Sequence, residues 1–589
     1  MRHTRSRIFM GAAVAAATAL VPAVAANAVP DVEDTVVQRT DDRPDDQSDA
    51  RRALIEEAVA QVINGEATPV TKGKGKAVQV SPGQWAQYGL QSTDNILTFL
   101  IEFGDQIDTR FPSAPAGPVH NEIPQPDRSV DDTTYWVEDF NRDHFQDIFY
   151  GDGESMTSLY REMSSGRYTV QGDTSDWVTV PFNEASYGQT ESQADMTRFI
   201  QDGANAWYAQ QQASGKTDAE ITQYLQQFDQ WDRYDYNRNG NFNEPDGYID
   251  HFQAVHAGEG EEAGAPEWAI WSHRWSVGQR AAGGPTWNRN GGIQVGSTDF
   301  WIRDYTTEPE NGGLGVFAHE FAHDLGLPDL YDTSGGENGT GFWTLMSSGS
   351  WMGHGQDTIG TTPNHMGAWE KLQLGWLDYA TVAHDEGATL VLGPSMHANK
   401  KGQALIVTLP EDANGRDRFY IAENRQYAGY DSTLRVGPYN FGWLETKPNW
   451  VEHFPYQDGL LVNYWNTAVS NNNTRIHPGT GRILPIDARP AALRWSDGVV
   501  ARNRIQSFDS TFGVERTDPI SLHRETAAGM TTLGVPAQAP VSTFDDSDPE
   551  RYYDAANPMG SVKVAGVGVT IRVVQSNSTG KMTVEVNGG

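Results

Sequence analysis

The sequence predicts an α+β protein, with a mixed helix and strand region over residues 95–380 and a β-rich, sandwich-like region over residues 381–589. In the first region, segments of helical periodicity alternate with short apolar runs. In the second, short apolar and β-branched runs are separated by Gly, Asn, Asp and Pro. A chain of 589 residues exceeds one hydrophobic core, and a hydrophobic content of 38% supplies enough apolar side chains for several.

The first 28 residues have the pattern of an export signal. Three arginines precede an apolar run over Ile8–Ala25, and Ala26-Asn27-Ala28 offers the small-x-small sequence that signal peptidase cleaves. A membrane anchor is the alternative, but Pro22 interrupts the run and the cleavage site follows it. We therefore predict a Sec-type signal peptide over residues 1–28, a secreted chain and no stable membrane insertion.

Residues 29–94 are predicted to form a pro-segment and linker. A helical pattern covers Arg52–Val62, and the Lys/Gly stretch Lys72–Lys76 suggests a flexible, cleavable linker. An ordinary disordered N-terminus is the alternative. If the segment inhibits the rest of the chain, it does so without a thiolate, because the sequence has no cysteine. A carboxylate such as Asp41 or Asp45, or simple steric cover, must serve instead.

Composition excludes several classes of function. The 78 acidic and 43 basic residues give a formal charge of −35, which repels nucleic acid phosphates, so no nucleic-acid partner is expected. The same surface suits hard cations such as calcium, although most of these acids simply keep the protein soluble. The absence of cysteine excludes disulfides, cysteine zinc fingers and thiol nucleophiles.

The elements of the first region follow in order. Ile96–Phe103 is a near-continuous apolar run, which predicts a buried strand. Ser155–Met163 has the pattern of a capped helix, and Thr217–Phe228 another, with Thr217 and Glu220 spaced as a capping box. Apolar alternation over Ile293–Tyr305 predicts a strand.

The second region contains many short strand-like segments. They are Leu390–Leu392, Ala404–Leu409, Phe419–Ala422, Leu460–Tyr464, a run in which Val567, Val569, Ile571 and Val573 alternate, and Met582–Val586 after the turn Asn577–Gly580. Strands at such close spacing favour a β-sandwich.

The strongest chemical signal is the sequence His319-Glu320-Phe321-Ala322-His323. On a helix, residues i and i+4 share a face, so both imidazoles can bind one metal ion, and imidazole is a preferred zinc ligand. Glu320 can exchange a proton with a metal-activated water. Gly312–Ala318 would begin this helix. Two ordinary histidines on a surface helix are the alternative interpretation.

The residues after the helix suggest the third ligand. Gly326 permits the helix to end in a sharp turn, after which the chain can return to the metal. Asp329, six residues beyond His323, is the predicted ligand, because Pro328 stiffens the turn just before it and carboxylate oxygen binds zinc. Asp332 is the rival, and Asp324 is a weaker one because it lies on a different helical face.

A second motif has the spacing of a calcium-binding loop. Oxygen-bearing side chains stand at its first, third and fifth positions, glycine at the sixth and an acid at the twelfth, so we expect a structural calcium ion. The candidate ligands are Asp235, Asn237, Asn239, Asn241 and Asp246. Asp246 replaces the usual glutamate and Pro245 is atypical, and an ordinary Asn/Gly-rich loop is the alternative.

Together with several other segments, the metal motif resembles a specific protein family. HEFAHDLGLPDLYD (319–332), GFWTLMSSGSW after it, GAWEKLQLGWLDY, SMTSLYREMSSGRYTV and DGYIDHFQAVHAGEGEE are similar to the immune inhibitor A family of secreted bacterial metallopeptidases. The resemblance covers residues 96–379 well and continues more loosely through DGLLVNYW and QSFDSTFG. It implies a metzincin-like zinc peptidase domain, structural calcium, secretion as a proenzyme and broad degradation of protein or peptide substrates.

The resemblance also implies roles for particular residues. It assigns one catalytic zinc ion to His319, His323 and Asp329, the acid/base role to Glu320 and the Met-turn to Met346. The third position is histidine in many other metzincins. The group that stabilises the oxyanion besides zinc is not identified by the motif, and His354, His365 and Tyr379 are the candidates.

A last group of acidic and histidine side chains is a weaker candidate for a functional site. The acids and histidines His251, His256, Glu259, Glu261 and Glu262 could line a cleft or bind a second cation, although structural roles are favoured for each.

The leading hypothesis is a zinc endopeptidase. The alternative is a secreted binding protein with a decayed protease domain, which the intact Glu320 disfavours.

Overall fold

The computed structural model describes residues 40–589 except 191, 279–282, 337–338, 356–357 and 397–401. The predicted signal peptide lies outside this range. Residues from Gln38 to the C-terminus form one compact unit. Within the described residues, no helix is long and apolar enough to cross a bilayer.

A five-stranded sheet organises the first half of this unit, in the order β5-β4-β6-β10-β7. Its strands are β4 (Thr93–Gln106), β5 (Thr169–Phe182), β6 (His251–His256), β7 (His273–Ser276) and β10 (Asp304–Pro309). The first four in this order are parallel, whereas β7 is antiparallel to β10 and forms an edge of the sheet. The strand predicted at Ile96–Phe103 is confirmed, within the longer β4.

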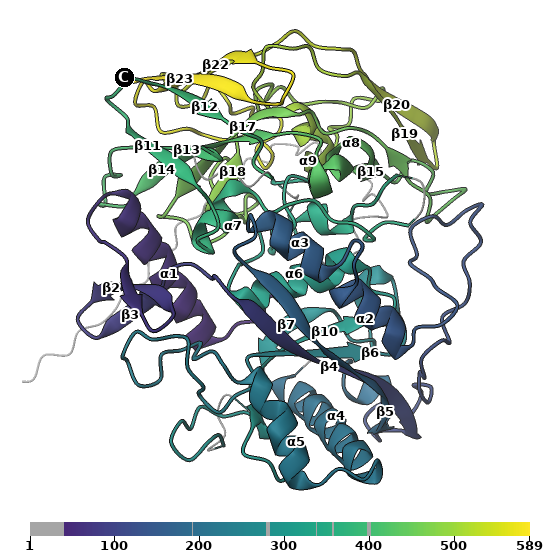
Figure 1. Ribbon diagram of the computed structural model, residues 1–589. Helices are drawn as coiled ribbons and strands as arrows, with labels where there is room; N and C mark the ends of the chain where they lie inside the picture. Colours follow the sequence, from purple (N-terminus) through teal and green to yellow (C-terminus); the bar gives the residue numbers. More distant parts are fainter. Residues whose placement is uncertain (1–39, 191, 279–282, 337–338, 356–357, 397–401) are drawn as a thin grey trace, which may run out of the picture. The chain divides into compact units, whose positions relative to one another are not determined.

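Helices cover both faces of the sheet (Figure 1). They are α2 (Arg142–Tyr150), α3 (Met156–Met163) and α6 (Leu314–Leu325) on one face, and α4 (Gln193–Ala213) and α5 (Asp218–Leu225) on the other. Strand β4 shows why: Leu97 and Phe99 pack on the α4 side, whereas Ile96 and Leu100 pack on the α6 side. Side chains alternate across a strand, so a strand covered on both faces is apolar throughout.

Local sequence signals place several helix ends correctly. Ser155 caps α3, and the capping box of Thr217 and Glu220 begins α5, both as predicted. The strand predicted over Ile293–Tyr305 is instead split into β8 (Ile293–Gln294), β9 (Trp301–Ile302) and the start of β10. Gly296 has a φ of +56°, so the chain turns there and alternation does not continue.

The expected pro-segment is folded onto the rest of the chain. It contains α1 (Asp46–Ile63), which begins six residues before the predicted helix, and a small sheet of β1 (Val70–Lys72), β2 (Gly75–Ser81) and β3 (Gln84–Gln87). The Lys/Gly stretch, expected as a flexible linker, is the turn of the β1–β2 hairpin. At Gly73 the hairpin approaches Asn241 so closely that an added Cβ would overlap its side chain.

The C-terminal half contains two sheets that share a core. One has the order β11-β13-β14-β17-β18 and the other β12-β23-β22-β21. Their strands are β11 (Tyr379–Ala383), β12 (Ala388–Leu392), β13 (Ala404–Thr408), β14 (Arg418–Arg425), β17 (Gly459–Asn466), β18 (Ile483–Pro485), β21 (Thr543–Asp545), β22 (Thr570–Ser576) and β23 (Met582–Asn587). Leu405 and Val462 of the first sheet pack with Ile571 and Val584 of the second, so the predicted sandwich-like packing is observed.

Shorter elements complete the described chain. They are α7 (Ala368–Gln373), α8 (Thr433–Val436), α9 (Asn503–Gln506) and the two-stranded pairs β15 (Tyr439–Asn440) with β16 (Glu452–His453) and β19 (Ile520–Thr526) with β20 (Gly529–Val535).

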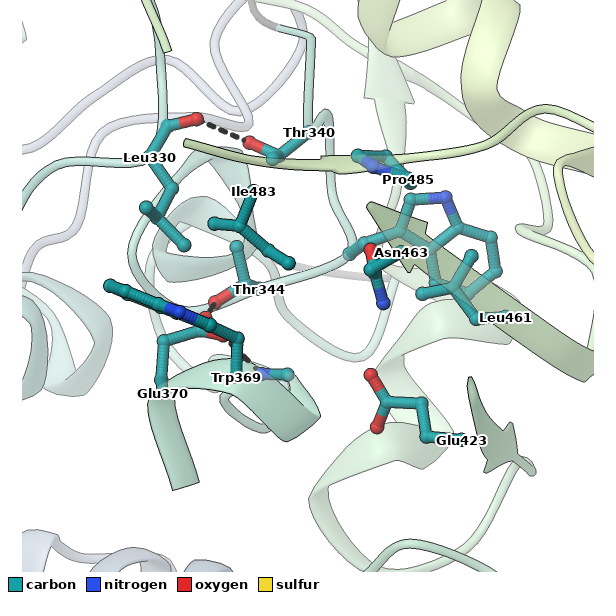
Figure 2. Close-up of a pocket in the computed structure, with 12 residues that line it drawn as sticks. Leu330, Thr340, Thr344, Trp369, Glu370, Glu423, Leu461, Asn463, Ile483 and Pro485 are labelled. Carbon is teal, nitrogen blue, oxygen red and sulfur yellow. Dashed lines mark hydrogen bonds between the residues drawn. The ribbon is translucent and has the colours of Figure 1, made fainter. Parts of the chain in front are cut away.

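The second face of the β14 and β17 sheet packs against the peptidase half. Ile421 and Trp465 belong to the same core as Phe321 of α6, which explains why these strands are buried on both faces. Figure 2 shows a small cavity at this contact, where the Glu370 and Glu423 carboxylates lie near Trp369 and Asn463. The two halves therefore share one continuous core and do not form separate globules.

Candidate metal centre

The helix that carries the predicted ligands is fixed by its apolar face and its ends. Phe317 and Phe321 contact Phe149 and Tyr160 edge to face, with ring centroids 5.0 and 5.2 Å apart. Gly326 ends the helix with a φ of +113°, which side chains with a Cβ rarely adopt. The opposite face is thereby directed away from the core, and it carries His319 and His323.

The two imidazoles and the Asp329 carboxylate converge as predicted. His323 Nε2 lies 3.0 Å from His319 Nε2 and 3.1 Å from Asp329 Oδ1, and His319 Nε2 lies 3.5 Å from that same oxygen. All three side chains are buried. Four atoms placed tetrahedrally at 2.0–2.1 Å from a zinc ion stand about 3.3 Å apart, so the spacing fits that metal.

The hydrogen bonds of the imidazoles also fit a metal. His319 Nδ1 lies 2.8 Å from the Leu345 carbonyl and His323 Nδ1 lies 2.7 Å from the Leu327 carbonyl, so each Nδ1 donates and each Nε2 is left as an acceptor. Asp329 Oδ1 is buried without a hydrogen-bond partner. Three electron-pair donors that face one point are a set that a bound cation would stabilise.

A fourth group comes from the N-terminal segment that was expected to be a pro-segment. Asp41, His319, His323 and Asp329 each offer a ligand atom, and these atoms all lie within 4.8 Å of one another. Asp41 Oδ2 is 3.5 Å from His319 Nε2. Burial lowers the pKa of His319, but the carboxylates of Asp329 and Asp41 outweigh it and raise that pKa to about 10, which shows how strongly the site favours positive charge.

Backbone pairing fixes Asp41 in this position. The Arg274 amide donates to the Asp41 carbonyl at 2.8 Å and the Arg43 amide donates to the Arg274 carbonyl at 3.0 Å, so the pro-segment lies parallel to edge strand β7. Helix α1 adds two contacts at the end of α6, where Arg51 donates to the Leu325 carbonyl at 3.2 Å and Arg52 to the Gly326 carbonyl at 3.1 Å. Cations at a helix C-terminus satisfy its last carbonyls.

Glu320 lies beside the ligands in an acidic and apolar environment. Its side chain is buried, and its Oε2 has no hydrogen-bond partner. Burial raises the pKa of this carboxyl well above its usual value, and the neighbouring carboxylates of Asp41, Glu308 and Asp329 raise it further. A carboxyl group with such a pKa can hold or release a proton near neutral pH.

The two rival aspartates have other partners. Asp332 accepts hydrogen bonds from the Ser334 amide at 2.9 Å and the Arg475 amide at 2.7 Å, which fixes the loop after the metal ligands. Asp324 pairs with Arg233 at 2.8 Å and with His251 Nδ1 at 2.5 Å on the opposite side of α6. The geometry therefore favours Asp329 as the third ligand.

The histidines predicted as candidates for oxyanion stabilisation have partners outside the metal cluster. His354 pairs with Glu154 at 2.9 Å, and His365 lies between Glu162 at 2.7 Å and Lys371 at 3.1 Å. Tyr379 begins strand β11 of the C-terminal sheet. None of these contacts involves a member of the metal cluster.

Two residues near the cluster were not predicted. The Tyr331 hydroxyl donates to Asp41 Oδ2 at 2.7 Å, and Trp271 Nε1 donates to Asp41 Oδ1 at 2.5 Å. Tyr331 follows Asp329 by two residues, so the motif itself could have suggested it. Trp271 reaches the site from the turn before β7, and nothing in the local sequence marks it.

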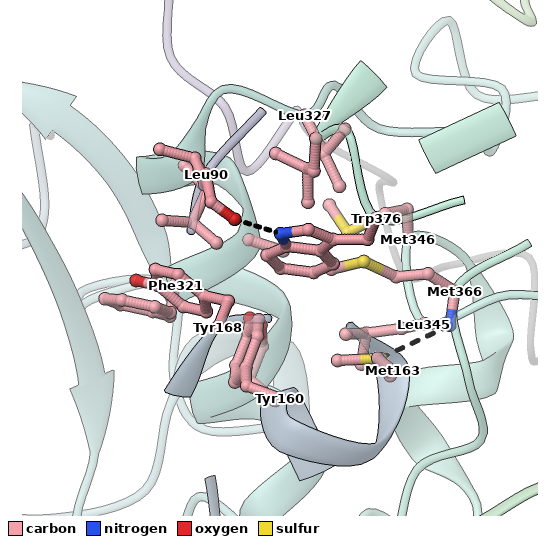
Figure 3. Packing of buried hydrophobic residues seen from close by; sticks show 14 of the residues in the cluster. Leu90, Tyr160, Met163, Tyr168, Phe321, Leu327, Leu345, Met346, Met366 and Trp376 are labelled. Atoms are coloured by element: carbon pink, nitrogen blue, oxygen red, sulfur yellow. Dashed lines mark hydrogen bonds between the residues drawn. The ribbon is translucent and has the colours of Figure 1, made fainter. Parts of the chain in front are cut away.

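Met346, which the resemblance assigns to a Met-turn, is buried in the core that contains α6. Its side chain lies beside Trp376 in this core (Figure 3), and its carbonyl accepts a 2.9 Å hydrogen bond from the Leu330 amide. The carbonyl of Leu345, the residue before Met346, accepts a hydrogen bond from His319 Nδ1. This segment therefore contacts His319 directly, and it contacts the chain next to Asp329 through Leu330.

The predicted calcium loop has the internal hydrogen bonds of such a loop. Asp235 accepts from the Gly240 amide at 3.0 Å, and Asn237 accepts from the Asn239 amide at 3.0 Å. Asn237, Asn239 and Asn241 each donate from Nδ2 to Glu244, at 2.7, 2.8 and 2.7 Å. The acid that joins these side chains is therefore Glu244.

Asp246, the predicted twelfth-position ligand, has other hydrogen-bond partners. It accepts from the Tyr248 amide at 3.0 Å and from Asn288 Nδ2 at 3.4 Å. Asp232 instead lies against the loop and accepts from the Tyr236 amide at 3.0 Å. Burial raises the pKa of Asp232 to about 7, and the charges of Asp235 and Glu244 contribute. Unneutralised carboxylates gathered in this way are what a cation would stabilise.

The weaker acid and histidine group does not assemble. His251 belongs to the Asp324 network, His256 Nδ1 lies 3.1 Å from the Ala257 carbonyl, and Glu262 accepts from the Ser272 amide at 3.1 Å. Glu259 and Glu261 likewise lie outside any metal-binding group. Of the residues that the structure describes, only the four around His319 form such a group of three or more.

A buried pair of imidazoles and a carboxylate, with a glutamate beside them on the same helix, defines a metallopeptidase. The description "Immune inhibitor A peptidase M6, catalytic domain" matches residues 83–377, and "Immune inhibitor A-like metallopeptidase, VEG domain" matches residues 413–585. The chain belongs to the immune inhibitor A family of metallopeptidases, which confirms the resemblance seen in its motifs.

Two curated relatives show the extent of this similarity. The chain is 36% identical over 318 residues to Immune inhibitor A of Bacillus thuringiensis subsp. alesti, covering 50% of this chain and 42% of that protein. It is 34% identical over 302 residues to Pre-pro-metalloprotease PrtV of Vibrio cholerae serotype O1, covering 48% of this chain and 30% of that protein. The matched part thus spans less than half the length of either relative.

Proposed function

We propose that this protein is a secreted, zinc-dependent endopeptidase with a metzincin-like catalytic domain, folded here in its latent form. The observation that carries the proposal is the convergence of His319, His323 and Asp329 on one point beside Glu320. Two imidazoles and a carboxylate are a donor set suited to a catalytic zinc ion that keeps one position for water or substrate.

The chain's own residues supply the remaining chemistry. When bound, zinc would make an attacking water more acidic and polarise the substrate carbonyl. Glu320 takes the proton of that water and delivers it to the leaving amine, and its buried position keeps competing solvent away. Tyr331 and Trp271 donate to Asp41 in the latent form, and we propose that a substrate group takes the place of this carboxylate.

The proposed function goes with a proposed division of the chain into four parts. Residues 1–28 form the signal peptide, residues 29–94 the pro-segment, residues 95–380 the catalytic domain and residues 381–589 the β-rich region. The pro-segment acts as an intramolecular inhibitor, because Asp41 offers a carboxylate to the metal centre and residues 41–43 occupy the edge of β7. The relative named Pre-pro-metalloprotease supports this organisation.

We propose a structural calcium ion in the loop from Asp235 to Glu244. The support is the hydrogen bonds that Asp235 and Asn237 accept from backbone amides within the loop, together with the raised pKa of Asp232 beside it. Glu244 replaces Asp246 as the acid of the proposed site, because the three asparagine side chains gather around Glu244.

A binding protein with a decayed protease domain would not need this set of groups. Glu320 is present and buried beside the ligands, and the carbonyls of Leu345 and Leu327 accept from Nδ1 of the two imidazoles and orient them. The proposed function is therefore hydrolysis of internal peptide bonds in protein substrates.

Chelation and metal replacement test the proposal. The full-length chain is secreted, processed and assayed for hydrolysis of casein before and after treatment with 1,10-phenanthroline, and then after addition of zinc. We expect activity to disappear with the chelator and to return with about one zinc ion per chain. Hydrolysis that resists the chelator would contradict a zinc enzyme, and a zinc-loaded, processed chain without activity would favour the binding protein.

A further inference from the structure

We propose that Arg303 forms a substrate subsite that binds an acidic side chain about four residues from the scissile bond. This inference rests on the proposed peptidase function and adds a specificity-determining residue to it. The pro-segment occupies the subsite in the latent form, where Asp45 takes the place of the substrate's acid.

The contact between Arg303 and Asp45 has the geometry of a built site. Arg303 Nη2 lies 3.1 Å from both carboxylate oxygens of Asp45, and the two side chains are 3% and 2% exposed. The rest of the guanidinium is fixed by other groups: Nε donates to the Asn290 carbonyl at 3.1 Å, and Nη1 donates to Asp304 at 3.0 Å. Release of the pro-segment would thus leave Nη2, already oriented, without Asp45.

The subsite lies along the same path as the metal centre. Asp41 reaches the metal cluster, and Asp42 forms a parallel backbone β-bridge with Arg274 of β7. Trp275 Nε1 donates to the Pro44 carbonyl at 3.1 Å. Asp45 follows Asp41 by four residues, which in extended chain corresponds to about 13 Å. A substrate that pairs with the same edge strand would place a side chain at Arg303 at this distance from the reacting carbonyl.

The balance of charge around Arg303 favours an acid over a neutral side chain. Asp304 pairs with both Arg274 and Arg303, and Asp324 pairs with both Arg233 and His251. Each of these carboxylates already serves two cations, so Asp45 supplies the additional negative charge. Without it, a positively charged site remains in a protein whose formal net charge is −35. A buried cation of this kind is stabilised by a carboxylate ligand.

Peptide series test the specificity directly. The full-length chain is activated by limited proteolysis and assayed with quenched peptides that share one scissile bond and carry Asp or Asn at successive positions from P5 to P5′. We expect kcat/KM for Asp to exceed that for Asn by about tenfold at the fourth position on one side, as for a hydrogen bond to a charged group. Arg303→Gln should remove the preference, and Arg303→Lys should retain part of it.

Arg142→Gln is the matched control. Arg142 also pairs with an aspartate, Asp173 at 2.8 Å, but it lies against β5 at the opposite edge of the sheet from β7, so the Asp preference should remain. Equal rates for Asp and Asn peptides, or a preference that persists in Arg303→Gln, would overturn the subsite.

Binding in trans separates the subsite from catalysis. A synthetic peptide of residues 40–64 is titrated against the activated chain, and Asp45→Asn in that peptide should weaken binding about tenfold. The same change should have little effect on binding to the Arg303→Gln chain. Complete absence of hydrolysis with this binding pattern would contradict the proposed activity and leave the subsite standing. Equal binding of both peptides to the unsubstituted chain would overturn the subsite.

Discussion

The Tyr331 hydroxyl donates a 2.7 Å hydrogen bond to Oδ2 of Asp41, although 290 positions separate the two residues. The same oxygen lies 3.5 Å from His319 Nε2, and Trp271 donates to the other carboxylate oxygen at 2.5 Å. Both carboxylate oxygens of Asp41 are therefore hydrogen-bonded beside the metal cluster. In the proposed latent form, this arrangement would block the metal centre without a cysteine.

Removal of the Asp41 carboxylate should weaken latency. Asp41→Ala in the full-length chain loses the contacts with Tyr331 and Trp271, so we expect its hydrolysis of a quenched peptide before any processing to exceed that of the unsubstituted chain at least tenfold. The Asp46→Ala chain, changed at an exposed acid in the first turn of α1, should remain latent. An Asp41→Ala chain as inactive as the unsubstituted one would show that steric cover by α1 is sufficient.

The third zinc ligand can be identified by metal titration. Asp329→Ala removes an oxygen that lies 3.1 Å from His323 Nε2, so zinc affinity should fall by at least tenfold. Asp332→Ala should leave zinc affinity nearly unchanged and lower the melting temperature, because Asp332 accepts hydrogen bonds from the Ser334 and Arg475 amides. Loss of zinc in the Asp332 variant alone would show that the ligand register is wrong.

Calcium should stabilise the folded chain through the loop around Glu244. At a concentration of about one hundred times the dissociation constant, one native-state site adds roughly 2.7 kcal/mol to the free energy of unfolding. Asp235→Ala and Glu244→Gln should each remove most of the calcium-induced rise in melting temperature. Asp246→Asn is the comparison, because the Asp246 carboxylate accepts hydrogen bonds from the Tyr248 amide and Asn288 instead of from the loop asparagines, and it should retain the rise. An undiminished rise in both of the first two variants would place calcium elsewhere.

Without calcium, stability should fall as the pH rises from about 4 to about 7. Burial raises the pKa of Asp232 from 3.8 to about 7, so over this interval the folded chain retains a proton that the unfolded chain has lost. Stability therefore decreases with pH, by an amount on the order of 4 kcal/mol for this group. Asp232→Asn should flatten the decline in melting temperature measured in chelator. A decline of equal slope in that variant would assign it to other carboxyl groups.

Much of the fold follows from local sequence. The caps of α3 and α5 and the apolar run of β4 determine their elements because the stabilising contacts lie within a few residues. Long-range pairing is different. The contact of residues 41–43 with β7 depends on backbone atoms, which leave no pattern in side chains. The split of the strand expected at 293–305 follows from the turn at Gly296, which interrupts an otherwise alternating segment.

The candidate site was predictable to the extent that it lies in one segment. His319, Glu320 and His323 share a helix, and Asp329 follows the turn at Gly326, so their spacing predicts their meeting. Trp271 comes from the segment just before β7 and has no motif. The loop spacing predicted Asp246, but the turns of the folded loop direct the asparagines toward Glu244, two positions earlier. Counting positions cannot detect such a difference.

The most direct test of the central claim is Glu320→Gln in the processed chain, measured for zinc content and peptide hydrolysis in the same sample. Glutamine preserves the shape of the side chain but cannot accept and return a proton. We predict about one zinc ion per chain, as in the unsubstituted protein, and a fall in kcat of at least a thousandfold. A zinc-loaded variant that retains more than a small fraction of the original rate would contradict the assignment of Glu320, and with it the proposed mechanism.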